Sequence, residues 1–276
     1  MERMKQKLAE AGISFRENEL LSAHCTFKIG GPAELFVMPE TESELCTAVM
    51  LCKKDAVRYY LLGNGSNILF ADEGFRGAVI DTTTLKAGAE FSGVGVTAGA
   101  GMKLSALCAG ALEHGLTGLE FAYGIPGTVG GAVYMNAGAY GGEMKDVLVS
   151  VRCLTAEGEI KEIPAEELDL GYRHSIFEEN GGCILSARFK LNEGRPEEIK
   201  AKMNELMAKR VDKQPLDKPS AGSTFKRPAG AFAAALIDQC GLRGYRHGGA
   251  AVSDKHCGFV VNLGGATCAD VLALCD

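Results

Sequence analysis

Two polar clusters of this 276-residue chain hold the side chains best suited to chemistry. Arg173, within the run Tyr172-Arg173-His174-Ser175, has a planar and permanently charged guanidinium that suits a carboxylate or an enolate, although a surface ion pair would use the same residue type. His174 is expected to be a solvated or packed histidine. Ser223 could donate a proton, and the alternative is a capped loop that contains prolines. No Ser-His-Asp arrangement or Gly-x-Ser-x-Gly motif surrounds Ser223, which disfavours a hydrolase.

Two glycine-rich segments could bring the backbone close to a ligand. The first, Gly63-Asn64-Gly65-Ser66-Asn67, could direct consecutive N–H groups at a pyrophosphate, and the alternative is an ordinary Asn-Gly hairpin turn. A Rossmann fingerprint is excluded, since Leu69 stands where its third glycine would be. The second segment runs over 124–132 and continues through 136–142. So much glycine has a high entropic cost on folding, so a ligand or tight packing between layers must require it.

The periodicity around these segments predicts mixed helices and strands. Apolar residues recur at helical spacing in five stretches, and short β-type runs lie between them. A hairpin is expected around Ala156-Glu157-Gly158. The expected helices cover 1–12, 42–53, 103–114, 197–210 and 232–240, and the expected strands cover 33–39, 58–62, 77–81, 94–98, 147–154, 159–163, 183–191 and a pair within 250–263.

The last third of the chain is expected to form a separate domain. Gly194-Arg195-Pro196 introduces a helix with proline at its first turn, and the boundary is placed there. A loop is expected over 214–222. A capping-box pattern over 267–270 starts one more helix, and the sequence stops at Asp276, six residues after Asp270. Because so short a helix is marginal, we expect the natural protein to continue beyond this point.

Composition restricts the possible partners. The formal charge of −6 is spread along the chain and gives no basic stripe for nucleic acid. No apolar run is long enough to span a bilayer, and the N-terminus lacks the pattern of a signal peptide. The ten cysteines form no C-x-x-C pair and no zinc-ligand spacing, so we expect free thiols, no metal and a cytoplasmic protein.

Six ordered motifs over some two hundred residues resemble the UDP-N-acetylenolpyruvoylglucosamine reductase family, in its shorter subtype. They are TFKIGGPA at 26–33, GNGSN at 63–67, GIPGTVGGA at 124–132, NAGAYGGE at 136–143, GYRHS at 171–175 and AGSTFKRP at 221–228. The resemblance implies an α+β fold, in which an FAD-binding domain of the vanillyl-alcohol-oxidase (PCMH) type precedes a smaller α/β substrate-binding domain. The implied divisions are an N-terminal helix at 1–18, FAD-binding subdomains at about 19–85 and 86–193, and a substrate domain at 194–276.

By the same resemblance, the chain would use NADPH to reduce FAD and then reduce the enolpyruvyl group of a UDP-sugar to give UDP-N-acetylmuramate, a peptidoglycan precursor. Arg173 would stabilise the negative charge that develops on the substrate, and Ser223 would donate the proton. Lys213, Tyr172 and Asn67 would bind substrate, with Lys213 at the diphosphate. The implied FAD contacts are Gly63, Asn64, Gly65, Ser66, Asn67, Gly124, Ile125, Pro126, Gly127, Thr128, Gly130, Gly131, Ala132, Asn136 and Gly138.

One departure from the family pattern leaves alternatives open. The family's third catalytic residue, a glutamate near the C-terminus, has no counterpart before Asp276. The chain could therefore be a catalytically impaired FAD-binding fragment, or another flavin oxidoreductase of the same superfamily. A monomer is expected.

Overall fold

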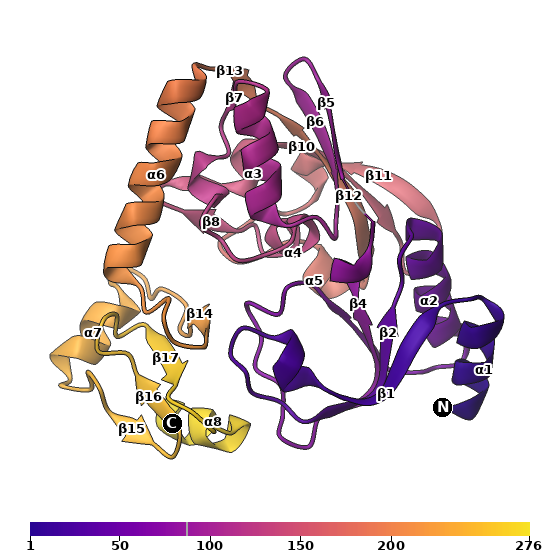
Figure 1. Cartoon of the computed structure of the whole chain (residues 1–276), viewed down its shortest axis with the longest axis horizontal. Helices are drawn as coiled ribbons and strands as arrows, with labels where there is room; N and C mark the ends of the chain where they lie inside the picture. Colours follow the sequence, from indigo (N-terminus) through magenta and orange to yellow (C-terminus); the bar gives the residue numbers. More distant parts are fainter. Residues whose placement is uncertain (87) are drawn as a thin grey trace. The chain divides into compact units, whose positions relative to one another are not determined.

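The computed structural model of the chain describes residues 1–86 and 88–276, which form two compact units (Figure 1). Unit 1 consists of Met1–Phe15, Val37–Asn64 and Val79–Ala208, and unit 2 consists of Arg16–Phe36, Gly65–Ala78 and Lys209–Asp276. The units therefore alternate along the sequence. The division into domains at residue 194 stays a prediction, because the units are defined by packing and do not follow consecutive ranges.

Unit 1 contains an antiparallel five-stranded sheet in the order β11-β10-β12-β6-β5. The predicted hairpin is confirmed, since β10 pairs with β11 and places Val151 opposite Ile163. In β12 the side chains alternate from Leu185 to Lys190, as expected for a strand with one buried face, whereas β10 buries five of its seven residues. The strands are β5 (Ala89–Ser92), β6 (Gly95–Gly99), β10 (Leu148–Leu154), β11 (Ile160–Pro164) and β12 (Cys183–Lys190).

The helices of unit 1 follow the apolar periodicity of the sequence. In α3, Leu104, Leu107, Cys108 and Ala111 form one buried stripe, and they belong to the same core cluster as strands β6, β10 and β12. The predictions over 1–12, 42–53 and 103–114 are confirmed, whereas α4 was not predicted. The helices are α1 (Glu2–Glu10), α2 (Glu42–Lys54), α3 (Leu104–Glu113), α4 (Val129–Tyr134) and α5 (Phe177–Asn180).

Unit 2 contains a smaller antiparallel sheet in the order β14-β17-β16-β15, against which α8 packs through β15 and β16. Thr267 and Asp270 form the predicted capping box at the start of α8. The loop prediction over 214–222 is wrong at its end, because Ser220–Ser223 forms β14. The other elements are β15 (Arg246–His247), β16 (Ala250–Val252), β17 (Phe259–Asn262), α7 (Ala233–Gln239) and α8 (Cys268–Cys275), while α6 (Pro196–Lys213) begins in unit 1 and ends in unit 2.

The remaining elements form one more sheet, two short strand pairs and several 3-10 turns. A four-stranded sheet has the order β1-β2-β4-β3, and two short pairs are β13-β7 and β8-β9. The strands are β1 (Ser14–Leu20), β2 (Pro32–Met38), β3 (Tyr59–Leu62), β4 (Phe75–Asp81), β7 (Leu116–Thr117), β8 (Gly138–Ala139), β9 (Gly142–Glu143) and β13 (Asn192–Glu193). Short 3-10 turns are η1 (Leu21–His24), η2 (Thr82–Thr84), η3 (Glu120–Ala122), η4 (Met144–Asp146) and η5 (Ala165–Glu167).

The cysteines are free thiols, and six of the ten are buried. Burial raises the pKa of Cys52, Cys108 and Cys183 to about 12, so these side chains are neutral and pack as small apolar groups. Among residues 1–86 and 88–276, no three His, Cys, Asp or Glu side chains gather where they could hold a metal ion. No helix in that described part is both long and apolar enough to cross a lipid bilayer.

Candidate flavin and substrate site

The two glycine segments meet within unit 1. Asn64, which follows β3, donates a hydrogen bond from its side-chain amide to the carbonyl oxygen of Pro126 at 2.8 Å. A Cβ atom added to Gly63 would lie 2.6 Å from Oγ1 of Thr128, so only glycine allows this approach. The structure therefore brings the start of the first segment against the second.

The second segment contains a helix start where a loop was expected. Thr128 caps α4, and its Oγ1 accepts a hydrogen bond from the amide of Gly131 at 3.2 Å. The amides of Val129 and Gly130 donate to the carbonyl oxygens of Met102 and Ala100. A Cβ on Gly130 would lie 2.9 Å from that of Ala100. Close packing thus accounts for Gly130, and these amides are occupied by the protein itself.

Asn136 links the second segment to the turn that contains Arg173. It is 1 % exposed and its φ angle is +39°, which asparagine tolerates better than most residues. Its side-chain nitrogen donates to the Glu143 carboxylate at 2.8 Å and to the Gly171 carbonyl at 2.9 Å, and its Oδ1 accepts from the Lys145 amide at 3.0 Å. The side chain is therefore fully used in holding the protein together.

Arg173 lies at the end of a tight turn, between Gly171 and His174, whose backbones exchange two hydrogen bonds. Its φ angle is +56°, an unusual conformation for a residue other than glycine. The guanidinium donates to the Gly138 carbonyl at 3.3 Å and lies over the Tyr172 ring. Unit 1 thus places Arg173 and Tyr172 beside Gly138 and Asn136.

His174, expected to be a solvated or packed histidine, is paired with two carboxylates. Its two ring nitrogens lie 3.2 Å from carboxylate oxygens of Glu178 and Asp169. The hydrogen bond to Glu178, and then that to Asp169, raises the pKa of His174. The spacing of four residues to Glu178 was the signal that the sequence interpretation missed.

In unit 2, the remainder of the first glycine segment meets the strand that carries Ser223. The amide of Thr26 donates to the Gly65 carbonyl at 3.0 Å, and its hydroxyl donates to the Ser220 carbonyl of β14 at 2.6 Å. Gly65 has a φ angle of +60°, and a Cβ there would lie 2.2 Å from the His24 carbonyl oxygen. Thr26 therefore connects the two motifs, a role that the sequence interpretation did not assign.

Ser223 is exposed at the end of β14, where the pairing with β17 shifts register between Ser220 and Ser223. Gly222, with a φ angle of +81°, is part of this irregularity. Lys213 is the exposed last residue of α6. Ser66 is half-buried and Asn67 is exposed. Arg173 belongs to unit 1, whereas Ser223 and Lys213 belong to unit 2.

The predicted ligand set fits FAD in its chemistry. Neither 63–67 nor 124–142 contains an acidic residue, and the adjoining Glu143 carboxylate, which accepts from Asn136 at 2.8 Å, is paired with Nζ of Lys145 at 3.1 Å. Ser66 and Asn67 offer a hydroxyl and an amide, whereas the Asn64 amide already donates to Pro126. Gly63, Gly65 and Gly130 pack against the protein itself. Within the second segment, the Gly127 amide donates to the Ile125 carbonyl at 2.9 Å and the Ala132 amide donates to the Thr128 carbonyl at 2.8 Å.

Comparison with known proteins identifies the class to which this fold and site belong. Residues 33–164 match the model of an FAD binding domain, so the chain is an FAD-dependent oxidoreductase of mixed helix and strand with a PCMH-type domain. Residues 214–276 match the C-terminal domain of UDP-N-acetylenolpyruvoylglucosamine reductase.

The curated relatives and a crystal structure agree with these matches. A UDP-N-acetylenolpyruvoylglucosamine reductase from Lachnoclostridium phytofermentans is 51 % identical over 263 residues, which cover 94 % of this chain and 85 % of the relative. That of Agathobacter rectalis is 50 % identical over 281 residues, covering 98 % and 88 %. The crystal structure of the enzyme from Thermus caldophilus matches with a TM-score of 0.82 and 41 % identity, covering 95 % and 92 %. The chain belongs to the UDP-N-acetylenolpyruvoylglucosamine reductase family.

Proposed function

We propose that the chain reduces an enolpyruvyl UDP-sugar to UDP-N-acetylmuramate, with FAD as the bound cofactor and NADPH as the reductant, during the synthesis of peptidoglycan precursors. The observation that carries the proposal is the hydrogen bond from Asn64 to Pro126, which joins two uncharged glycine segments in the unit where Arg173 is held at Gly138. The enolpyruvyl UDP-sugar is the substrate class of the relatives at 50–51 % identity, which are UDP-N-acetylenolpyruvoylglucosamine reductases. We place the protein in the cytoplasm, as a monomer.

FAD supplies hydride transfer when it is bound. The chain's own residues must then balance charge and deliver a proton. Arg173 interacts with the carboxylate of the enolpyruvyl group, where negative charge develops as a hydride adds to the terminal carbon. Ser223 gives its hydroxyl proton to the neighbouring carbon, and Lys213 binds the diphosphate, while Tyr172 and Asn67 contact the rest of the substrate.

An anaerobic absorption experiment tests the reaction class. We expect purified protein to show a flavin band, NADPH to bleach it, and the enolpyruvyl UDP-sugar to restore it. A band that NADPH does not bleach would support a different flavin enzyme, and bleaching without recovery would support an impaired fragment. A protein that takes up no FAD would contradict the proposal.

Ser223→Ala tests the proposed proton donor. We expect NADPH to bleach the flavin of the variant at the wild-type rate, while the rate of recovery on adding substrate falls by about 10²- to 10⁴-fold, the usual contribution of a general acid. Ser220→Ala, on the same strand, is the matched control, because Ser220 contributes its backbone carbonyl to Thr26. Recovery at the wild-type rate in Ser223→Ala would exclude Ser223 as the donor.

A further inference from the structure

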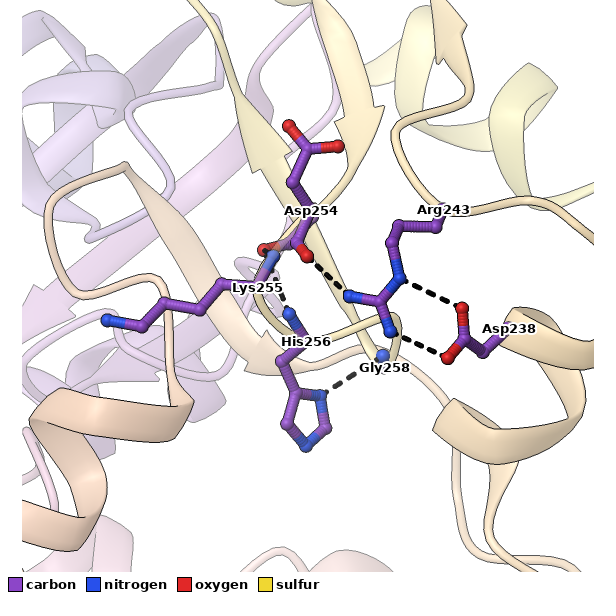
Figure 2. A network of polar contacts seen from close by, with 7 residues as sticks. Asp238, Arg243, Asp254, Lys255, His256 and Gly258 are labelled. Atoms are coloured by element: carbon purple, nitrogen blue, oxygen red, sulfur yellow. Dashed lines mark hydrogen bonds and ion pairs between the residues drawn. The ribbon is translucent and has the colours of Figure 1, made fainter.

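The loop Ser253–Gly258, which joins β16 to β17 in unit 2, is held in one conformation by its own hydrogen bonds. Oγ of Ser253 accepts from the amides of Lys255 at 3.1 Å and His256 at 3.3 Å. The amide of Ser253 donates to the Phe259 carbonyl at 2.9 Å. The amide of Gly258 donates to Nδ1 of His256 at 3.1 Å, as Figure 2 shows. These bonds fix the backbone of the loop from Ser253 to Gly258.

This loop fixes the residue that follows Ser223. The Gly258 carbonyl accepts from the amide of Thr224 at 2.8 Å, and Oγ1 of Thr224 accepts from the amide of Val260 at 3.2 Å. Ser223 itself pairs with Phe259 just after the register shift in β14. Because β14 is irregular before Ser223, the two bonds at Thr224 fix the backbone from which the Ser223 side chain extends.

Arg243 holds the other side of the loop. Its Nε and Nη2 atoms donate to the two carboxylate oxygens of Asp238 at 2.9 and 2.6 Å, and its Nη1 donates to the Asp254 carbonyl (Figure 2). A bidentate pair of this kind fixes the plane of the guanidinium, unlike a single contact. The third donor is thereby directed at the backbone of the loop.

The chain around Arg243 is shaped to support this contact. Helix α7 is followed by Gly241 in the left-handed region, and the amides of Gly241 and Leu242 donate to the carbonyls of Asp238 and Ile237. That ending brings Arg243 back to Asp238. At Gly244, whose φ angle is +72°, an added Cβ would lie 2.4 Å from a carboxylate oxygen of Asp254. The turn thus packs directly on the loop.

We propose that Arg243 is a positioning residue for proton donation: through Asp254 and the loop Ser253–Gly258, it holds the hydroxyl of Ser223 in place. The inference rests on the proposed function, in which Ser223 is the proton donor. Arg243 touches neither the substrate nor the flavin in this account. Its removal therefore affects one half of the catalytic cycle and leaves the other intact.

The test measures both half-reactions of the FAD-loaded Arg243→Met variant by anaerobic stopped flow. We expect an unchanged rate of bleaching by NADPH, an unchanged half-saturating concentration of the enolpyruvyl UDP-sugar, and recovery about 10- to 100-fold slower, the cost of misplacing a reacting group. Arg243→Lys keeps the charge but loses the bidentate geometry, so it should be slowed in the same direction. Gly244→Ala, whose Cβ would meet the Asp254 carboxylate and displace the same loop, should also slow recovery.

A double variant separates positioning from general damage. If Arg243 acts through Ser223, Arg243→Met combined with Ser223→Ala recovers no more slowly than Ser223→Ala alone. Arg16→Met, which removes a 3.0 Å ion pair with Glu19 elsewhere in unit 2, is the control and should leave both half-reactions unchanged. Should Arg243→Met fail to fold, Arg243→Lys and Asp238→Asn carry the same double-variant test.

The outcomes distinguish this inference from the proposed function. Wild-type recovery in Ser223→Ala would overturn the proton-donor assignment itself. If flavin recovery is slow in Ser223→Ala but proceeds at the wild-type rate in Arg243→Met and Arg243→Lys, only the positioning role is overturned. Additive losses in the double variant would also overturn it, because they would show that Arg243 acts by another route.

Discussion

Replacing Asn136 with alanine should destabilise unit 1 by about 4 kcal/mol. The variant loses three hydrogen bonds, each worth about 1 kcal/mol in a buried setting. The bond to Glu143 is charge-assisted, but the Glu143 side chain is 35 % exposed, so we count it as an ordinary bond. Alanine at a φ angle of +39° adds a backbone cost of about 1 kcal/mol.

Urea denaturation followed by circular dichroism measures this loss. Asn18→Ala is the matched control, because Asn18 is exposed and has a φ angle of +52°. It carries the backbone cost without the three hydrogen bonds, so its loss should be about 1 kcal/mol. The difference between the two variants isolates the hydrogen bonds. Equal losses in Asn136→Ala and Asn18→Ala would refute the reasoning.

Two further changes test other parts of the site. Gly63→Ala places a Cβ 2.6 Å from Oγ1 of Thr128, so we expect the free energy of unfolding to fall by about 1–3 kcal/mol in thermal denaturation, and FAD to bind more weakly in a fluorescence titration. Gly88→Ala is the control, because its Cβ meets nothing within 4 Å. Equal behaviour of the two variants would contradict the packing argument. His174→Gln should lower the free energy of unfolding at about pH 5.5, where the histidine is charged in both the folded and the unfolded protein. The difference in stability from wild type should vanish as the pH rises through the raised pKa of His174. A difference that grows with pH would contradict this prediction.

Periodicity predicted the regular elements well where the core decides the structure. Helices α2 and α3 each bury one apolar stripe, and the β10–β11 hairpin follows from its turn. It failed at α4, where Gly130 and Gly131 hide a helix start that only the cap at Thr128 indicates. It also missed β1, because Ser14–Leu20 is mostly exposed and lacks an apolar alternation.

The candidate site could be predicted as a set of segments but not as an arrangement. The segments containing Gly63 and Pro126 were each identified, yet the hydrogen bond that joins them spans 62 positions and has no local signal. Thr26 is a further example, since its hydroxyl meets the Ser220 carbonyl 194 positions later. Contacts at such separations depend on the whole topology, which no single window of sequence contains.

The alternation of the units has a consequence for experiments on gene fragments. The chain is divided into six alternating segments, so it passes from one unit to the other five times. A cut after Ala208 would release only one of the three segments that make up unit 2, and would leave Arg16–Phe36 and Gly65–Ala78 behind. Neither unit can therefore be expressed as a single continuous piece. When homologous genes are recombined, all three segments of a unit should come from the same parent gene.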